Sequence, residues 1–302
     1  MHIPDGFLSP GVAATAWVVA GSGIASALRA ERREAAPMPA GILGSVAAFV
    51  FAAQMVNVPV AAGTSGHLVG ATLAAVLLGP WRGLLAIAAV LAVQALLFQD
   101  GGILAYGANL SDMGLAGCFV GYAIARGVGR RVSGPRGIAA GAVLGGFAAT
   151  VSGAVGVAVW LSLSGLYPLA GILPVMLVTH VAIGLLEASL TGAILVTLLR
   201  WRPDLVVGLD ASVGRRPAVL VLGLLGTALA VAAFVAPFAS ALPDGLEKTA
   251  ETLGFASRAR APWPRLAAIA PAVTGVIGTG AAAALAWVFG RTLATVDDDA
   301  HR

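Results

Sequence analysis

The sequence predicts an all-α polytopic membrane protein of about seven transmembrane helices followed by a C-terminal two-helix hairpin, with the N-terminus outside. Three observations lead to this fold class: the composition, the lengths of the apolar runs and the distribution of cationic residues. Of the 302 residues, 59% are hydrophobic and only 11% are charged, and the mean hydropathy is +0.93. Soluble domains carry about 25% charged residues, so this composition is typical of a chain embedded in a bilayer.

Nine apolar runs define the expected helices. A helix needs about 20 apolar residues to cross a hydrocarbon core of about 30 Å. The runs lie near residues 8–28, 39–58, 67–79, 81–99, 107–126, 138–162 and 170–199, with two more near 217–239 and 266–290. We therefore expect a membrane domain over residues 1–200, a charged cytoplasmic linker over 201–216 and a second domain of two transmembrane helices over 217–302.

The cationic residues predict the orientation, because cytoplasmic segments of membrane proteins carry an excess of Lys and Arg. With the N-terminus outside, only four of the 18 cationic residues face outward: Lys248, Arg258, Arg260 and Arg265. The cationic residues are scattered between apolar runs, which argues against a nucleic-acid partner. The lipid bilayer is the expected surroundings, as a multi-pass protein of a bacterial inner membrane.

The third run is too short to span alone. From His67 to Gly79 a helix would rise only about 20 Å at about 1.5 Å per residue. Residues 59–66 would have to fill the missing depth, and irregular backbone at membrane depth is tolerated only where it is buried in protein or lines a cavity. Broken helices of this kind mark transporter binding sites. We expect His67 to open a short helix there; the alternative is a surface loop after the second span.

The first two residues contain a candidate metal chelate. The N-terminus lacks the basic region of a signal peptide, so Met1 is expected to stay on the chain. Its α-amine, the backbone nitrogen of His2 and the His2 Nδ1 can then close adjacent five- and six-membered chelate rings around one ion. Planar sites rich in nitrogen favour Ni²⁺ and Cu²⁺. His67, expected on the same outer side, would complete the plane.

An alternative without metal binding stays open, in which His2 is a solvated tail residue and His67 forms hydrogen bonds with its neighbours at a helix end. Gln54 and Asn57 flank the irregular stretch and are expected to support the metal ligands. The outer connection 98–112, which contains Asp100, Asn109 and Asp112, is expected to cap helices, with covering a site as its alternative.

His180 and Glu187 are seven residues apart and so share one helical face. A charged residue at a bilayer centre costs about 2.5–3.5 kcal/mol unless it is partnered. We expect both in an interior polar network with Gln54, Gln94 or Asn57. Groups in such a network orient metal-binding imidazoles, so this role is favoured over direct ligation.

Three segments resemble the nickel/cobalt substrate-capture subunits (NikM/CbiM) of energy-coupling factor (ECF) transporters. They are Met1-His2-Ile3-Pro4-Asp5-Gly6, Gln54-Met55-Val56-Asn57-Val58-Pro59 and Thr64-Ser65-Gly66-His67, and the similarity covers about residues 1–200. The resemblance implies that Met1, His2 and His67 supply four nitrogens to the ion, with Thr64 and Ser65 beside them. It also implies a transmembrane coupling subunit and cytoplasmic ATPases as partners, Ni²⁺ or Co²⁺ as the transported ligand, and no resident cofactor.

A second resemblance lies in the C-terminal domain. The sequence Leu242-Pro243-Asp244-Gly245-Leu246-Glu247 is similar to the PDGLE motif of the N-type auxiliary subunit (NikN). This similarity implies a fusion of the two subunits and an auxiliary role in loading the site. The residues by themselves indicate only a helix capped by Asp244, within a connecting hairpin.

Motifs that are missing narrow the function. The chain has no G-x-x-x-x-G-K-[ST] sequence, and its one lysine is Lys248, so energy for uptake must come from partners. It has no Ser/His/Asp set or HExxH motif, and we expect a transporter subunit rather than an enzyme. Two alternatives remain: an intramembrane metalloenzyme using His67, His180 and Glu187, and a permease for an organic solute with the N-terminus as a plug. The Irving–Williams order favours Ni²⁺ over Co²⁺ at such a site.

Overall fold

A computed structural model describes residues 1–33, 39–201, 217–261 and 271–300. The predicted linker, apart from Trp201, lies outside the described residues. Most of the described chain is helical, which confirms the predicted fold class. Within these ranges six helices are long and apolar enough to cross a membrane. They are built on α1 (Pro10–Glu31), α4 (Pro80–Val93), α7 (Gly134–Leu163), α8 (Leu169–Trp201), α9 (Pro217–Ala230) and α11 (Pro271–Ala300).

Shorter elements complete the bundle. The apolar α2 spans Ala40–Gln54, and one helical run combines α5 (Tyr106–Asn109), a π-helical segment (Leu110–Ala116) and α6 (Gly117–Arg131). A second π-helical segment, Gln94–Phe98, extends α4, and α9 continues through Val231–Val235 and Ala236–Phe238. Several helices begin where the sequence signals it, because proline suits the first helical turn, as in α1, α4 and α7.

The third span is broken, as the short run predicts, but its helix begins later than expected. After α2 the chain forms the two-residue strands β1 (Val58–Pro59) and β2 (Ser65–Gly66), which pair antiparallel around a 3₁₀ turn (Ala61–Gly63). Helix α3 spans only Ala71–Leu78, so the prediction that His67 opens the helix is wrong. Gly70 has φ +74°, a left-handed conformation that stops the helix from extending back to His67.

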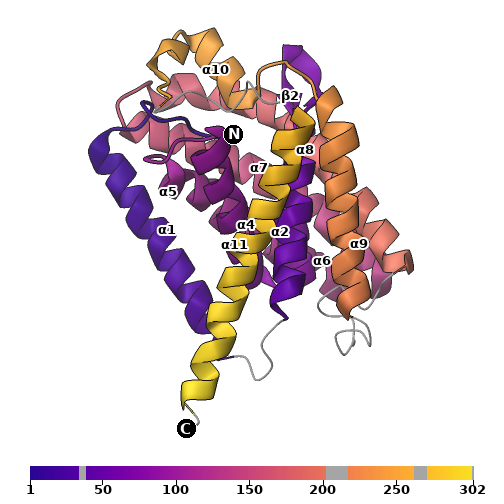
Figure 1. The fold of residues 1–302 in the computed structure, drawn as a ribbon. Helices are drawn as coiled ribbons and strands as arrows, with labels where there is room; N and C mark the ends of the chain where they lie inside the picture. Colours follow the sequence, from indigo (N-terminus) through magenta and orange to yellow (C-terminus); the bar gives the residue numbers. More distant parts are fainter. Residues whose placement is uncertain (34–38, 202–216, 262–270, 301–302) are drawn as a thin grey trace.

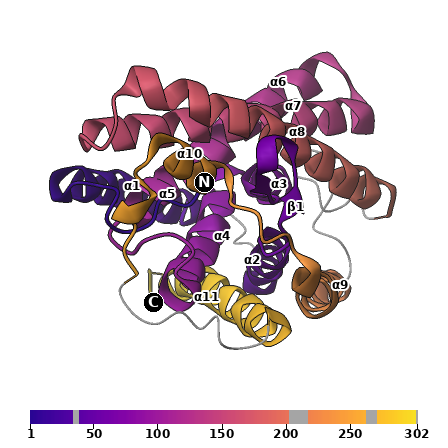
Figure 2. The same cartoon turned by 90° about the horizontal axis from the view of Figure 1, so that it is seen from above.

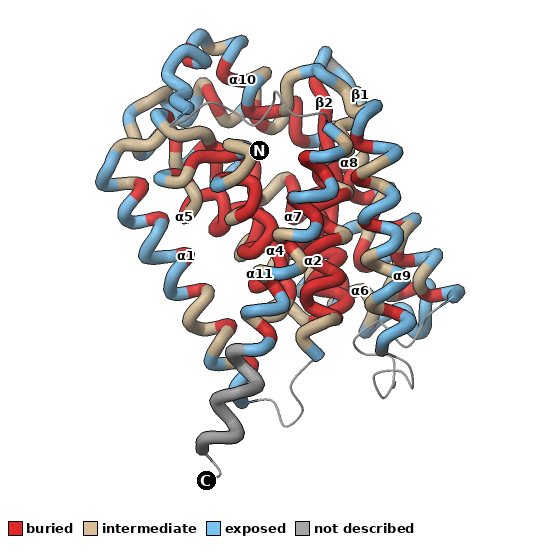
Figure 3. Tube along the Cα trace, viewed as in Figure 1, coloured by how far each residue is buried: buried red, intermediate tan, exposed pale blue. Residues whose placement is uncertain are grey.

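The two C-terminal helices flank α2. A Cβ atom at Gly44 would lie 2.8 Å from the carbonyl oxygen of Ala283, and one at Gly278 would meet the Phe51 ring. Small residues permit this close packing between membrane helices. The buried residues concentrate in α2 and α4, whereas α1, α9 and α11 expose their outer faces (Figure 3). All residues of α3 are also buried. Exposed side chains such as Phe234 and Phe238, at 74% and 87%, suit contact with lipid.

The two termini lie at opposite ends of the bundle. The N-terminus and α10 (Gly245–Leu253) lie at one end, and the C-terminus lies at the other (Figure 1). Seen from above, α10 and the N-terminus lie in the middle of the bundle, between the α7–α8 layer and α11 (Figure 2). Helix α10, from the C-terminal part of the chain, therefore lies at the same end of the bundle as the first residues.

Candidate metal centre

The first residues fold into the bundle instead of forming a solvated tail. Met1 and His2 are only 6% and 7% exposed, and Ile3 is fully buried. Asn109 holds this segment with two hydrogen bonds: its Oδ1 accepts from the Ile3 backbone N–H (2.7 Å), and its Nδ2 donates to the Ile3 carbonyl (3.0 Å). The segment is therefore fixed by a side chain on α5.

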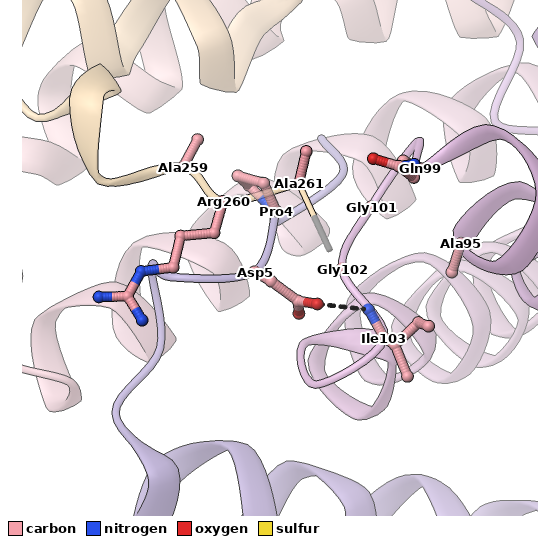
Figure 4. A pocket seen from close by; sticks show the side chains of 10 residues that line it. All are labelled: Pro4, Asp5, Ala95, Gln99, Gly101, Gly102, Ile103, Ala259, Arg260 and Ala261. Carbon is pink, nitrogen blue, oxygen red and sulfur yellow. Dashed lines mark hydrogen bonds between the residues drawn. The ribbon is translucent and has the colours of Figure 1, made fainter. Parts of the chain in front are cut away.

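Asp5 provides a second anchor. Its carboxylate accepts from the backbone N–H groups of Ile103 (3.1 Å) and Leu104 (2.9 Å). Figure 4 shows Asp5 pointing at Ile103 beside a cavity of about 100 Å³, which is also lined by residues 259–261 of the second domain. The Arg260 N–H donates to the Asp5 carbonyl (2.7 Å). The N-terminal segment thus lies between residues 103–104 and residues 259–261.

The Met1 amine meets a carboxylate of the predicted auxiliary loop, which is residues 243–247 of the PDGLE-like motif. Its nitrogen lies 2.6 Å from Asp244 Oδ2. Burial raises the pKa of Asp244, but the Met1 ammonium outweighs this and holds that pKa well below its ordinary value. The other carboxylate oxygen, Oδ1, caps α10 by accepting from the N–H groups of Leu246 and Glu247. One side chain therefore orders both the start of α10 and the N-terminal amine.

The two predicted imidazole ligands lie side by side. The rings of His2 and His67 have centroids 5.6 Å apart and are inclined by 28°. Metal–imidazole bonds of about 2.0–2.1 Å run along the plane of each ring, so these stacked rings would have to direct their nitrogens to an ion at their common edge. His67 Nδ1 donates to the Leu68 carbonyl (3.0 Å), and this leaves Nε2 as the ring nitrogen without a hydrogen.

The electrostatics favour a neutral His2. Burial, reinforced by the Met1 ammonium, lowers the pKa of His2 to about 3. The imidazole therefore needs no deprotonation before it binds metal at neutral pH. Among the described residues no cluster of three or more His, Cys, Asp or Glu side chains could hold a metal ion. A site here depends on the main-chain nitrogens of Met1 and His2.

A cavity of about 260 Å³ opens onto both histidines, and its other polar lining residues include Gln54, Asn57, Gln94, Asp100, Asp244 and Glu247. Asp100 Oδ1 lies 3.1 Å from His2 Nδ1. Burial, followed by the nearby Asp244 charge, raises the pKa of Glu247. These carboxylates make the entrance attractive to a cation.

The residues predicted to support the ligands divide into two groups. Gln54 belongs to a buried hydrogen-bond chain that reaches His2 through Gln94. Asn57 lines the cavity, and its buried Oδ1 has no hydrogen-bond partner. Thr64 and Ser65 instead shape the loops: Thr64 Oγ1 donates to the Ala61 carbonyl (2.7 Å) and Ser65 Oγ to the Leu242 carbonyl (2.7 Å).

Glu187 and His180 are both buried on α8 but have separate partners. Glu187 accepts from the backbone N–H groups of Val69 (2.5 Å) and Gly70 (3.1 Å), just after His67. His180 Nδ1 donates to the Met176 carbonyl (2.8 Å), and its buried Nε2 has no partner. A Cβ atom at Gly245 would lie 2.9 Å from that Nε2. Glu187 therefore supports the His67 loop, and His180 lies under the auxiliary loop.

The auxiliary loop covers the centre through its backbone. The Pro243 carbonyl accepts from the Ser65 N–H (2.8 Å), and the Asn57 carbonyl accepts from the Ser240 N–H (2.8 Å). Asp244 and Glu247 form a reciprocal capping box, and Leu246 is buried. The predicted helix N-cap is present, and the loop also reaches the N-terminus, which the residues alone did not indicate.

The predicted capping role of the connection 98–112 does not describe Asp100 and Asn109. Asp100 and Asn109 contact His2 and Ile3 instead of capping helices, so the alternative of covering a site describes them better. Gln94 carried a further signal as an amide inside an apolar run. It begins a π-helical segment, a rare conformation that is frequent at functional sites.

Comparisons with known proteins agree with this architecture. Residues 2–205 match the family described as the cobalt uptake substrate-specific transmembrane region, and residues 218–266 match the PDGLE domain. The fused nickel transport protein NikMN of Rhodobacter capsulatus is 36% identical over 222 residues, covering 68% of this chain and 64% of that protein. The cobalt transport protein CbiM of Sorangium cellulosum is 36% identical over 214 residues, covering 68% of this chain and 94% of that protein.

Two solved structures share the fold. The crystal structure of a transition metal transporter has a TM-score of 0.61 and 32% identity, covering 68% of this chain and 94% of its own. That of a truncated transition metal transporter has a TM-score of 0.60 and 33% identity, covering 66% of this chain and 99% of its own.

Proposed function

Because the chain belongs to the cobalt uptake substrate-specific transmembrane family and carries a PDGLE domain, we propose that it captures Ni²⁺ through Met1, His2 and His67 as the substrate-binding component of an ECF-type importer. The coarser function is a transmembrane component of cobalt or nickel transport, and not an enzyme. The matches over residues 2–205 and 218–266 support a division into a metal-capturing domain of 1–200 and an auxiliary domain of 217–302.

One observation carries the proposal: the stacked His2 and His67 rings line a cavity together with three carboxylates, one of which, Asp244, is ion-paired to the buried Met1 amine. The Met1 amine, the His2 amide nitrogen and His2 Nδ1 form the chelate, and His67 Nε2 supplies the fourth nitrogen. Such a plane suits Ni²⁺ better than Co²⁺. Asp100, Asp244 and Glu247 attract the cation toward the nitrogens.

Delivery to the cytoplasm requires other chains. The sequence carries no phosphate-binding loop of the G-x-x-x-x-G-K-[ST] type. We assign ATP hydrolysis to cytoplasmic ATPase subunits, coupled through a transmembrane subunit in a bacterial inner membrane. Radioactive nickel uptake should then depend on these partners being expressed together with this chain.

The decisive test changes the length of the N-terminus and leaves every side chain in place. Two glutamines inserted between Met1 and His2 place three backbone nitrogens between the α-amine and the imidazole, so that amine and imidazole no longer fit into one four-nitrogen plane, and the absorption band of planar Ni²⁺ should disappear. Intact mass should first show that the purified chain begins at Met1. Two glutamines inserted after the exposed Arg131 serve as the matched control. Nickel binding that survives the first insertion unchanged contradicts the proposal and favours a permease in which the N-terminus is only a plug.

A chemical test uses the single lysine. The α-amine of Met1 and Lys248 Nζ are the two primary amines of this sequence. Bound Ni²⁺ should protect Met1 from an acylating reagent and leave Lys248 reactive. Equal protection of both amines, or of neither, would contradict ligation by the N-terminal amine.

A further inference from the structure

A chain of buried hydrogen bonds begins at His2. Its Nε2 lies 3.2 Å from Gln94 Oε1, Gln94 Nε2 donates to Gln54 Oε1 (2.7 Å), and Gln54 Nε2 donates to the Val69 carbonyl (2.7 Å). Gln54 and Gln94 are each 3% exposed. These hydrogen bonds connect the N-terminal segment, α4, α2 and the loop that carries His67.

The Val69 carbonyl at the end of this hydrogen-bond chain fixes which group donates and which accepts at every step. A backbone carbonyl can only accept a hydrogen bond, so Gln54 must present its NH₂ group to Val69 and its oxygen to Gln94. Gln94 must then present its NH₂ group to Gln54 and its oxygen to His2. The His2 nitrogen that faces Gln94 therefore has to carry a hydrogen.

A neutral imidazole carries one hydrogen, and the partner of one nitrogen decides which nitrogen is free for metal. We propose that Gln94, oriented by Gln54 and the Val69 carbonyl, is a positioning residue that holds His2 as the Nε2–H tautomer and thereby presents Nδ1 to the metal. This inference rests on the proposed function and deepens it, because only Nδ1 closes a six-membered ring with the His2 amide nitrogen.

Asp100 favours the opposite tautomer, since its Oδ1 lies 3.1 Å from His2 Nδ1. The Asp100 side chain is 50% exposed, so water can solvate it when Nδ1 carries no hydrogen. Gln94 is buried, and an Nδ1–H tautomer would leave two acceptors facing each other there. The buried partner therefore determines the tautomer, and Asp100 lends negative charge beside the free nitrogen.

The Val69 end of the hydrogen-bond chain is also fixed. The N–H of Val69 donates to Glu187 Oε2 (2.5 Å), and the N–H of Gly70 donates to Glu187 Oε1 (3.1 Å). Glu187 on α8 thus holds the peptide whose carbonyl ends the chain. The orientation of one imidazole at the N-terminus is tied in this way to a carboxylate on a different helix.

Histidine tautomers can be measured in the full-length protein without metal. In a sample labelled with ¹⁵N-histidine and reconstituted in lipid nanodiscs, His2 should show a protonated Nε2 and an unprotonated Nδ1. His67 and His180 should show the reverse, because their Nδ1 atoms donate to the carbonyls of Leu68 and Met176. These two residues are internal controls, and His2→Ala assigns the His2 signals.

Two substitutions of Gln94 by side chains of similar length distinguish a role in positioning His2 from a role in packing. Gln94→Met removes the acceptor, so His2 should lose the pure Nε2–H tautomer and Ni²⁺ affinity should fall about 10–100-fold. Gln94→Glu, with its buried carboxyl protonated, keeps an oxygen facing His2 and an O–H facing Gln54 Oε1, and should retain the tautomer and most of the affinity. Unchanged His67 and His180 signals would show that the fold persists.

Three results would overturn the inference: an Nδ1–H tautomer in the wild-type protein, Gln94→Met with unchanged His2 signals, or Gln94→Met with unchanged Ni²⁺ affinity. If Gln94→Met does not fold, the wild-type and Gln94→Glu tautomers still decide. A wild-type protein with the Nε2–H tautomer but no Ni²⁺ binding would contradict the proposed function alone, because the tautomer is measured without metal.

Discussion

The amino nitrogen of Met1 lies 2.6 Å from Oδ2 of Asp244, so the first residue of the chain is ion-paired to the second domain. An ammonium at Met1 presents one positive charge to Asp244. A Ni²⁺ ion that has displaced protons from the amine and the His2 amide also leaves one net positive charge there. Asp244 can therefore anchor the N-terminal segment with and without metal.

Replacing Asp244 with Asn should release the Met1 amine. Asn still caps a helix, so α10 should remain intact. Removing one partner of a buried ion pair costs about 3–5 kcal/mol, and less here because Asp244 is partly exposed. We expect faster acylation of Met1 than in the wild-type protein and a lower melting temperature. Glu251→Gln removes a surface carboxylate near Lys248 and should change neither. Equal Met1 reactivity in both variants would argue against the anchor.

Acid should loosen the N-terminal segment through His2. Its pKa is lowered to about 3 in the folded protein, against about 6.5 when unfolded. Its contribution to stability is therefore complete above pH 6.5 and declines as the pH falls toward 3. The melting temperature should drop more between pH 7 and pH 5 in the wild-type protein than in His2→Gln. Asp244 does not confound this window, since its lowered pKa affects stability only below about pH 4. Parallel pH profiles would show that His2 is not buried in its neutral form.

Gly245→Ala should displace the auxiliary loop. The added Cβ atom would lie 2.5 Å from His180 Cε1, and overpacking of this kind costs about 1–3 kcal/mol. Hydrogen exchange at the Ser65 amide, which donates to the Pro243 carbonyl, should accelerate. Gly223→Ala on α9 is the matched control, because open space surrounds that position. An unchanged Ser65 exchange rate in Gly245→Ala would mean that the loop tolerates the added atom.

Glu187→Leu should weaken the His67 loop. It leaves the buried N–H groups of Val69 and Gly70 without their acceptor, at about 1–3 kcal/mol for each unsatisfied group. The melting temperature and the Ni²⁺ affinity should both fall, whereas Glu187→Gln, which keeps one acceptor oxygen, should lose less of each. Equal losses in the two variants would indicate that the negative charge, and not hydrogen bonding to the loop, is the contribution of Glu187.

The fold was largely predictable because the bilayer imposes a simple length requirement on apolar helices. The short third run also indicated the break before α3, since a helix from His67 would be too short to span. The start of α3 at Ala71 was missed because Gly70 and the Glu187 carboxylate decide it. That carboxylate lies on α8, and no local pattern connects α8 to this loop.

For the candidate site, the sequence alone determined which atoms could chelate a metal, because a histidine at position two and a free amine form adjacent rings whatever the fold. Only the tertiary structure decided what surrounds those atoms. It brings Asp244 to the Met1 amine and Gln94 to His2 Nε2, and it turns Asp100 and Asn109 toward the N-terminal segment. The physical reason is that chelation is a property of adjacent bonds, whereas charge pairing and tautomer choice depend on groups that only packing between helices brings within 3 Å or so of each other.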